Sequence, residues 1–256
     1  MKFFGSVANI LKNERITDKF FRLKLDINGI PAAKPGQFIM LKISHSTDPL
    51  LRRPFAIFHQ NGKNIEIVYR IAGKGTCLLS AMGKGEKLSV LGPFGNGFGI
   101  LNASPVLMVA GGTGIASLGM LAERIRGATL LFGAKSKDET GLLRHFRKSG
   151  HKTMIATEDG SAGVKGMATD IFLKVDLKKF KKIYACGPIP MLKEVSRVAA
   201  KNKISCEVSL EGRMACGFGV CQGCVVPARN TEQEYLRVCA EGPVFDSGKI
   251  SWEEIT

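Results

Sequence analysis

Short apolar runs separated by turn residues dominate the first hundred residues. The runs are rich in β-forming residues, show little helical periodicity and lie at residues 2–10, 20–25, 37–42, 55–59, 64–70 and 87–92. Gly, Pro, Asp and Asn stand between them, and one short helical segment at residues 77–82 interrupts the series. This spacing predicts a small all-β barrel or sandwich.

From Pro105 onward, strand-like and helix-like segments alternate. Apolar runs at residues 106–110, 129–133, 152–157 and 183–185 are interleaved with helical patterns at residues 118–126, 141–148 and 190–201. Such alternation is typical of an open parallel sheet with helices on both faces. After residue 205 the chain becomes turn-rich and cysteine-dense.

These patterns predict the fold class, an antiparallel β barrel followed by an α/β domain and a C-terminal tail. We expect the barrel at residues 1–102, the α/β domain at residues 103–205 and the tail at residues 206–256. The tail is too short to form a hydrophobic core of its own, but its turns suit it to wrap a metal centre.

The composition is that of a folded protein with a basic surface. Of the 256 residues, 45% are hydrophobic and 23% are charged, which argues against a disordered or coiled-coil chain. The 37 Lys and Arg residues outnumber the 22 Asp and Glu residues, for a net charge of +15. This excess is spread along the chain, and its one dense cluster, at residues 178–182, belongs to no nucleic-acid-binding motif. We therefore predict no nucleic-acid partner.

The sequence predicts neither a membrane span nor a secretory leader. The longest apolar stretches, residues 104–110 and 129–134, are far shorter than the ~20 residues that cross a bilayer. The N-terminus reaches Lys12, Glu14 and Arg15 before an apolar signal core develops. We expect a cytoplasmic protein with no membrane partner.

Four of the seven cysteines crowd together in the tail with the spacing C-x₄-C-x₂-C-x₁₄-C. They are Cys216, Cys221, Cys224 and Cys239. The spacing of the first three is that of plant-type ferredoxins, and glycines between them allow the backbone to wrap closely around a [2Fe–2S] cluster. A structural zinc site is the alternative, although it more often shows two C-x₂-C pairs. Cys206 lies in a strand-like run and is interpreted as a small core residue.

Three glycine- and arginine-containing segments suggest phosphate-binding sites. Arg53 stands at a strand end, and Gly73-Lys74-Gly75-Thr76 opens a helix, where N–H groups can face a phosphate. Gly111-Gly112-Thr113-Gly114 connects a strand to a helix at the place of a nucleotide loop, without the full G-x-G-x-x-G spacing. Each segment taken alone is also compatible with a simple turn.

The order of these motifs resembles the ferredoxin–NADP reductase superfamily. Within it, the chain is most similar to the electron-transfer subunits of NAD-dependent, class 1B dihydroorotate dehydrogenases, over nearly its whole length. The segments that carry this resemblance are residues 50–54, 91–98, 157–161, 213–224 and 238–243.

The resemblance implies sites for FAD and NAD and ligands for the cluster. For FAD it implies Arg53, Pro54, Phe55, Ala56, Tyr69, Arg70 and Ile71 around the flavin, with Gly75 and Thr76 at its pyrophosphate. For NAD it implies Gly111, Gly112, Thr113, Gly114, Cys186, Gly187 and Pro188. Ala56 departs from the family, which usually carries a serine or threonine there, and Thr113 stands where many relatives have a smaller residue.

The resemblance also implies a function in electron transfer, with no catalytic acid, base or nucleophile in this chain. A partner subunit would oxidise dihydroorotate at its own FMN, in pyrimidine biosynthesis, and electrons would pass through the cluster and FAD to NAD⁺. The resemblance further implies an assembly of two copies of each subunit, a heterotetramer. A flavin is needed between the cluster and NAD because the cluster carries single electrons, whereas NAD exchanges a hydride.

Two other functions remain open at this point. One is a NAD(P)H-dependent reductase subunit of an electron-bifurcating ferredoxin:NADP reductase or of a sulfhydrogenase, and the other is a non-catalytic module that binds zinc. The choice between NAD and NADP is also open to argument, because Lys135 and Lys137 follow the strand at residues 129–134 and Asp138 is the nearest acid. The resemblance favours NAD.

Overall fold

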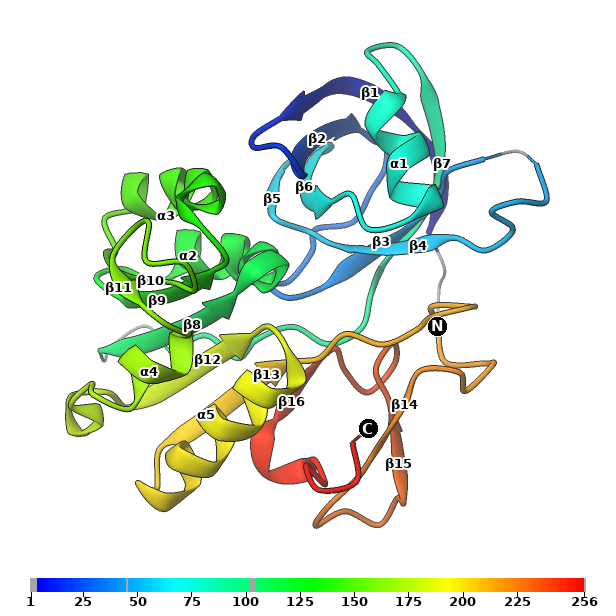
Figure 1. Ribbon diagram of the computed structural model, residues 1–256. Coiled ribbons are helices and arrows are strands. Elements are labelled where there is room, and N and C mark those ends of the chain that lie inside the picture. The colour runs from blue at the N-terminus through cyan, green and yellow to red at the C-terminus, as the bar shows by residue number, and fades with distance from the viewer. Residues whose placement is uncertain (1–3, 45, 102–104, 256) are drawn as a thin grey trace.

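The N-terminal part of the chain is an antiparallel barrel (Figure 1), as predicted. The computed structural model describes residues 4–44, 46–101 and 105–255. The strands of the barrel are β1 (Gly5–Arg15), β2 (Phe20–Asp26), β3 (Phe38–Lys42), β4 (Arg53–Ala56), β5 (His59–Asn61), β6 (Asn64–Arg70) and β7 (Lys87–Phe94). They pair in the order β4-β3-β7-β1-β2-β6-β5, and helix α1 (Lys74–Ala81) follows β6.

A second sheet, parallel except at one edge, forms the α/β part. Its strands are β8 (Val106–Gly111), β9 (Thr129–Ala134), β10 (Lys152–Thr157), β11 (Val164–Lys165), β12 (Lys182–Cys186), β13 (Ser205–Ser209) and β16 (Val244–Asp246), in the order β11-β10-β9-β8-β12-β13-β16. Every residue of β8 is buried, as expected for a central strand covered on both faces.

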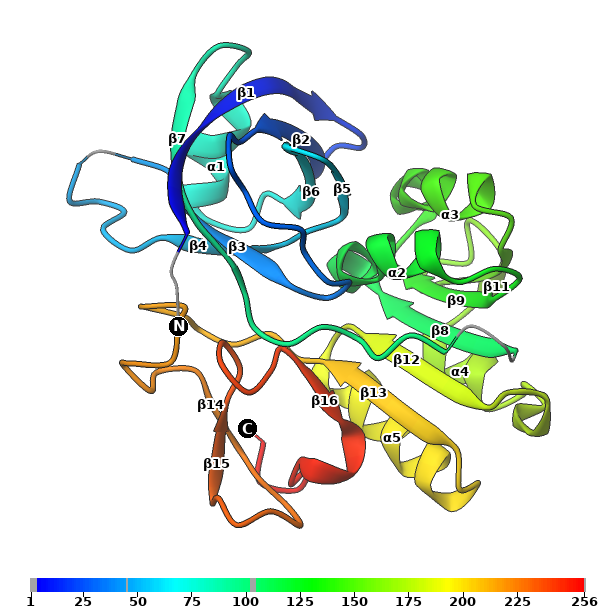
Figure 2. The same ribbon diagram turned by 180° about the vertical axis from the view of Figure 1, so that it is seen from behind.

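Helices cover both faces of this sheet, which confirms the predicted fold class (Figures 1 and 2). On one side lie the 3-10 helix η1 (Gly112–Leu118), α2 (Gly119–Arg124), the 3-10 helix η2 (Lys137–Leu143) and α3 (Arg144–Lys148). On the other lie α4 (Ala168–Phe172) and α5 (Ile189–Lys201). Short 3-10 turns follow at η3 (Leu177–Lys179) and η4 (Ser247–Lys249). Alternate residues of β8 enter two separate cores: Leu107 packs with α4 and α5, whereas Met108 packs with η1 and α2.

Several element boundaries differ from the sequence-based expectations. The run at residues 55–59 is divided between β4 and β5, and α1 begins three residues earlier than the expected helix at residues 77–82. The early start follows from Thr76, whose hydroxyl accepts the N–H groups of Ala72 and Gly73 at 2.9 and 3.1 Å and closes the first turn. The expected helix at residues 118–126 ends at Arg124, and the short elements β11 and α4 were not predicted.

The C-terminal tail is built into the second sheet. β13 spans the expected boundary at residues 205 and 206, pairs in parallel with β12, and carries β16 antiparallel on its outer edge. Cys206 is 3% exposed in the core beside them, as expected of a structural residue. A hairpin of β14 (Val225–Pro227) and β15 (Tyr235–Arg237) completes the tail. The other expected boundary, between residues 102 and 103, and the start of the first run at residue 2 lie outside the described residues.

Within residues 4–44, 46–101 and 105–255, no helix has both the length and the apolar character needed to cross a membrane.

Candidate functional site

A cavity of about 320 Å³ lies where the barrel, the α/β part and the tail meet. The expected flavin residues that line it are Pro54, Phe55, Ala56, Tyr69 and Arg70. Thr113, Ser117 and Ser209 close it from the α/β part, and Glu211, Gly212 and Met214 close it from the tail. Residues that are far apart in the sequence therefore surround one cavity, and its apolar and aromatic lining suits a flat ring.

Tyr69 is a rigid wall of this cavity. Its hydroxyl donates to Asn13 Oδ1 at 3.0 Å, and its ring stacks on Phe21 with centroids 5.5 Å apart and meets Phe55 edge-on at 5.8 Å. Burial raises the pKa of Tyr69 to about 12. With its hydroxyl bonded inside the barrel, Tyr69 contributes shape to the cavity and no mobile proton.

Arg53 lies against the N-terminus of α1. A Cβ on Gly75 would stand 3.1 Å from Arg53 Nε, so the glycine leaves room for this guanidinium. Arg53 Nη1 also donates to the carbonyl of Leu51. The positive end of the helix and a guanidinium side by side are suited to bind a diphosphate. Ile71 directly follows β6 and packs against the barrel core, away from the cavity lining.

A larger cavity, of about 610 Å³, opens at the carboxyl ends of β8 and β12. Of the residues expected at an NAD site, those that line it are Gly111, Gly112, Thr113, Gly114, Gly187 and Pro188. The strand order reverses between β8 and β12, which is the switch point at which open α/β sheets bind their ligands. The two loops are in close contact there: a Cβ on Gly114 would lie 2.3 Å from the carbonyl oxygen of Cys186.

Cys186 was expected at the NAD site together with Gly187 and Pro188, but it does not line the larger cavity with them. Its side chain is fully buried, is absent from the lining of either cavity and lies beside Ser117 and Ser209. Burial raises the pKa of the Cys186 thiol to about 12. The residue therefore shapes the turn from inside the sheet.

Three side chains, Arg70, Thr113 and Glu211, line both cavities. Two ligands bound in these cavities would therefore meet at this shared boundary. Glu211 is open to the cleft, yet enough protein surrounds it that desolvation raises the pKa of its carboxyl, against the charge of Arg70. No sequence motif pointed to Glu211, because its position between the cavities depends on how β13 and the barrel pack.

The far end of the larger cavity carries both signs of charge. Lys135, Glu139 and Glu158 line it, whereas Lys137 and Asp138 do not. The backbone N–H of Lys137 instead donates to Ser161 Oγ at 2.7 Å. Asp138 is the first acid after β9 in the sequence, but Glu139, the next residue along η2, is the one that lines the cavity.

The four tail cysteines are held by backbone N–H groups. The Cys239 sulfur accepts from Gly219 at 3.1 Å, and the Cys224 sulfur accepts from the N–H of Cys239 at 3.4 Å. The Cys216 sulfur accepts from Phe218 and Cys221, and the Cys221 sulfur accepts from Gly223, each at 3.5 Å. N–H groups aimed at sulfur stabilise thiolates, the form that binds iron.

The pKa values of the cysteines fit a site for a positive group. For Cys216, desolvation would raise the pKa of the thiol, but N–H donors outweigh it and lower that pKa to about 6. For Cys239, desolvation and the neighbouring Cys224 raise the pKa to about 12. Crowded sulfurs disfavour each other's thiolates, and bound iron would remove this cost. Among the described residues, no three His, Cys, Asp or Glu side chains are grouped so as to hold a single metal ion.

Strand β3 connects the cysteine loop to the smaller cavity. Phe38 lines that cavity, and Met40, on the same face of the strand, lies beneath Gly217, where a Cβ would be 2.7 Å from Met40 Cγ. Gly217 has a φ of 83°, in the region that favours glycine. The rings of Phe38, Phe94 and Phe218 follow at centroid distances of 6.0 and 6.2 Å. The cysteine loop thus packs directly on the wall of the cavity.

A barrel, a parallel sheet with a cavity at its switch point and a C-terminal cysteine loop define a reductase of the ferredoxin–NADP reductase type with an added iron–sulfur segment. The family model described as the iron-sulfur cluster binding domain of dihydroorotate dehydrogenase B matches residues 211–251. The chain is 38% identical to the dihydroorotate dehydrogenase B (NAD⁺) electron transfer subunit of Caldanaerobacter subterraneus subsp. tengcongensis, over 93% of this chain and 95% of that protein. It is 35% identical to the protein of the same name from Fusobacterium nucleatum, over 96% and 98%.

The chain belongs to the family of dihydroorotate dehydrogenase B (NAD⁺) electron transfer subunits, which confirms the resemblance seen in the sequence. Among solved structures, that of an NADH-dependent reduced ferredoxin-NADP oxidoreductase, described for flavin-based electron bifurcation, is similar with a TM-score of 0.85 and 28% identity, over 96% of this chain and 90% of that chain. The ferredoxin reductase of carbazole 1,9a-dioxygenase shares the fold, with a TM-score of 0.69 and 17% identity, over 80% of this chain and 67% of that chain.

Proposed function

We propose that this chain accepts electrons from a catalytic dihydroorotate dehydrogenase subunit and delivers them to NAD⁺ through a [2Fe–2S] cluster and FAD. The observation that carries the proposal is the placement of the three sites. The two cavities share Arg70, Thr113 and Glu211, and the cysteine loop packs on β3, whose Phe38 lines the smaller one. When bound, the cluster supplies single-electron transfer, and the flavin supplies the exchange between single electrons and hydride.

The residues of the barrel would hold FAD. Arg53, Gly75 and Thr76 are proposed to place its pyrophosphate at the N-terminus of α1, since the guanidinium lies over Gly75. The ring would lie in the smaller cavity, with Tyr69 and Phe55 as its walls and with Ile71 supporting β6 from behind. Pro54, Ala56 and Arg70 complete the proposed contacts. Ala56 has no side-chain hydroxyl, so only its backbone can donate there.

The glycine loop and the turn after β12 would hold NAD. Gly111, Gly112, Thr113 and Gly114 would place its phosphates at the switch point, with Gly187 and Pro188 on the opposite side. Cys186 would act from beneath the turn. The flavin and nicotinamide rings would meet beside Thr113 and Glu211, which line both cavities, and their contact would exclude water there.

Cys216, Cys221, Cys224 and Cys239 are the proposed ligands of the cluster. Cys224 and Cys239 are 4% and 1% exposed, whereas Cys221 is exposed, so one side of the loop is open to a partner. We propose that this partner carries FMN and that two copies of each subunit assemble. The cytoplasmic location stays a prediction from the sequence.

The test is reconstitution with and without the partner. The purified chain is expected to contain one FAD and two irons and to oxidise NADH with an artificial acceptor, but not to oxidise dihydroorotate until an FMN-containing catalytic subunit is added. Cys221→Ser should abolish electron transfer from the partner and spare NADH oxidation, and Cys206→Ser is the matched control, which should keep its iron. Stoichiometric zinc without iron, or dihydroorotate oxidation without the partner, would overturn the proposal.

A further inference from the structure

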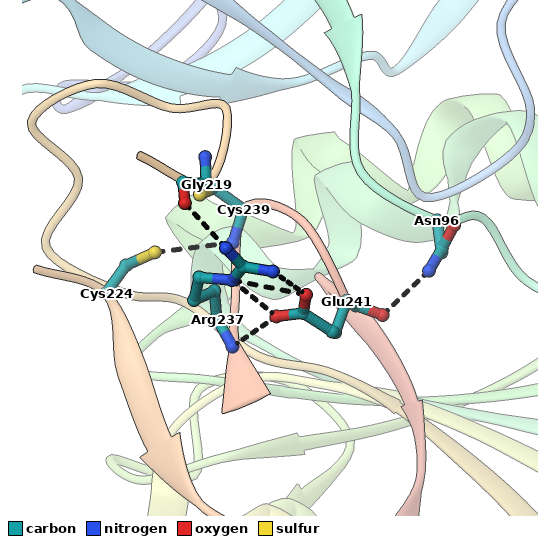
Figure 3. Close-up of polar contacts among 6 residues, drawn as sticks. All are labelled: Asn96, Gly219, Cys224, Arg237, Cys239 and Glu241. Atoms are coloured by element: carbon teal, nitrogen blue, oxygen red, sulfur yellow. Dashed lines mark hydrogen bonds and ion pairs between the residues drawn. The ribbon is translucent and has the colours of Figure 1, made fainter. Parts of the chain in front are cut away.

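Arg237 joins the two separate segments that carry the tail cysteines (Figure 3). Its Nη1 donates to the carbonyl of Gly219 at 2.7 Å, in the loop between Cys216 and Cys221. Its Nε donates to both carboxylate oxygens of Glu241 at 3.2 and 3.0 Å, and its Nη2 contacts the same carboxylate. Arg237 and Glu241 flank Cys239, so one guanidinium connects the cysteine loop to the turn that holds the fourth sulfur.

Gly219 is the residue on which this connection acts. Its N–H donates to Cys239 Sγ at 3.1 Å, the shortest of the N–H to sulfur bonds described above, while Arg237 holds its carbonyl. Its φ of 90° lies in the region that favours glycine, and a Cβ there would be 3.0 Å from Ala240 Cβ. Glycine has the greatest backbone freedom of any residue, so an N–H group at this position needs an outside contact to stay aimed at the sulfur.

The charge of Arg237 is largely balanced by its partner. Arg237 and Glu241 form an ion pair, with Arg237 Nη2 on Glu241 Oε1. The two side chains are 35% and 26% exposed. Because the pair carries no net charge, its effect on the sulfur depends mainly on where it holds the backbone at Gly219: Arg237 fixes the peptide unit that directly follows the one whose N–H faces Cys239 Sγ.

The same turn is anchored on the barrel. Asn96, which follows β7, donates from Nδ2 to the carbonyl of Glu241 at 2.8 Å and from its backbone N–H to the carbonyl of Gly242 at 2.5 Å. The position of the turn is therefore fixed relative to the barrel that would carry the flavin. Arg237, through its bond to Gly219, fixes the cysteine loop to the same turn.

We propose that Arg237 is a positioning residue that sets the reduction potential of the cluster by keeping the Gly219 N–H on the Cys239 sulfur. The proposal rests on the cluster ligands of the proposed function. A hydrogen bond to a ligand sulfur stabilises the reduced, more negative cluster, so it raises the potential. Loss of the connection therefore lowers the potential without removing a ligand.

The experiment is a redox titration of the full chain followed by electron paramagnetic resonance of the reduced cluster. Arg237→Gln removes both the positive charge and the guanidinium that bonds Gly219 and Glu241 at once. Arg237→Lys keeps the charge but loses that branched set of donors. Both are expected to lower the potential by at least the equivalent of a tenfold change in the electron-transfer equilibrium, 59 mV for one electron. The hyperfine coupling of the exchangeable N–H proton nearest the cluster should weaken in both. Arg197→Gln is the control. Arg197 also binds a carboxylate through two guanidinium nitrogens, that of Glu194 on α5, and its replacement should change neither the potential nor the coupling.

Each outcome decides the proposal. A wild-type potential in Arg237→Lys together with a lowered potential in Arg237→Gln would show a pure charge effect and overturn it, as would unchanged potentials in both. Selective loss of iron from both variants, with FAD content and melting temperature retained, would show that Arg237 is needed to hold the cluster rather than to set its potential, and would overturn the proposal. Loss of FAD and iron together would make Arg237 a general folding contact and overturn it. Wild-type protein that binds no iron would instead refute the proposed function.

Discussion

The contact between the glycine loop and the turn after β12 gives the sharpest test of the nucleotide site. In Gly114→Ala, the new Cβ would stand 2.3 Å from the carbonyl oxygen and 2.5 Å from the carbonyl carbon of Cys186. Both neighbours are backbone atoms, and ordinary van der Waals contact begins near 3.4 Å. The two loops must therefore separate by about 1 Å, since neither atom can rotate away.

The magnitude follows from that displacement. Overpacking of this kind costs about 1–3 kcal/mol of folding free energy, and a 1 Å misplacement of a bound reactant costs on the order of 10²-fold in rate. We expect kcat/KM for NADH with an artificial acceptor to fall by about 10²-fold, while FAD content stays unchanged because the barrel is untouched.

The assay is steady-state NADH oxidation beside FAD quantification and thermal melting. Gly83→Ala is the matched control, because Gly83 has ordinary backbone geometry and its nearest contact would be the end of the Glu86 side chain at 3.8 Å. A kcat/KM within twofold of wild type in Gly114→Ala would refute the reasoning that the close approach of the two loops forms the NAD site.

Three further predictions concern FAD, the choice of nucleotide and pH. Arg53→Gln should weaken FAD binding by about ten- to a hundredfold, measured by fluorescence titration of the apoprotein, because a charge-assisted contact worth about 1.5–3 kcal/mol is lost; Arg52→Gln should not, since Arg52 is bonded to Ser89. NADH should be preferred over NADPH in kcat/KM by at least about tenfold, or ~1.4 kcal/mol, and Glu139→Gln should narrow that ratio by removing repulsion of a 2′-phosphate. Turnover with NADPH equal to that with NADH would contradict this assignment. His59, whose pKa is raised from 6.5 by a hydrogen bond to Glu123, should stabilise the contact of β5 with α2 below pH 6.5 and lose that effect as pH rises through its folded pKa. For Glu123, desolvation is outweighed by its histidine partners, which lower its pKa to about 2, so its effect is lost as pH falls from 4.5 toward 2. Melting temperature should therefore peak between these limits, and a profile in His59→Gln identical to wild type would count against this coupling.

Features that depend on short stretches of chain were determined by the sequence alone. The short spacing of Cys216, Cys221 and Cys224 restricts them to one tight loop, because too few residues separate them for a strand or helix to intervene. The apolar runs predicted the barrel and the parallel sheet, because the pattern of apolar residues along a strand, which reflects burial on one or both faces, can be read from a few consecutive residues. The family followed from motifs that are each continuous in the sequence, and the comparisons confirmed it.

Contacts between distant segments were decided only by the tertiary structure. Glu211 reaches both cavities because it follows β13 at the point where the chain meets the barrel, and Glu139 rather than Asp138 lines the larger cavity. Cys186, which lies in a matching motif, is turned into the core between Ser117 and Ser209. Arg237 bonds the carbonyl of Gly219, which lies eighteen residues earlier in the sequence. No periodicity in the sequence encodes which of two neighbouring side chains faces a cavity, because that orientation is set by the packing of whole elements against each other.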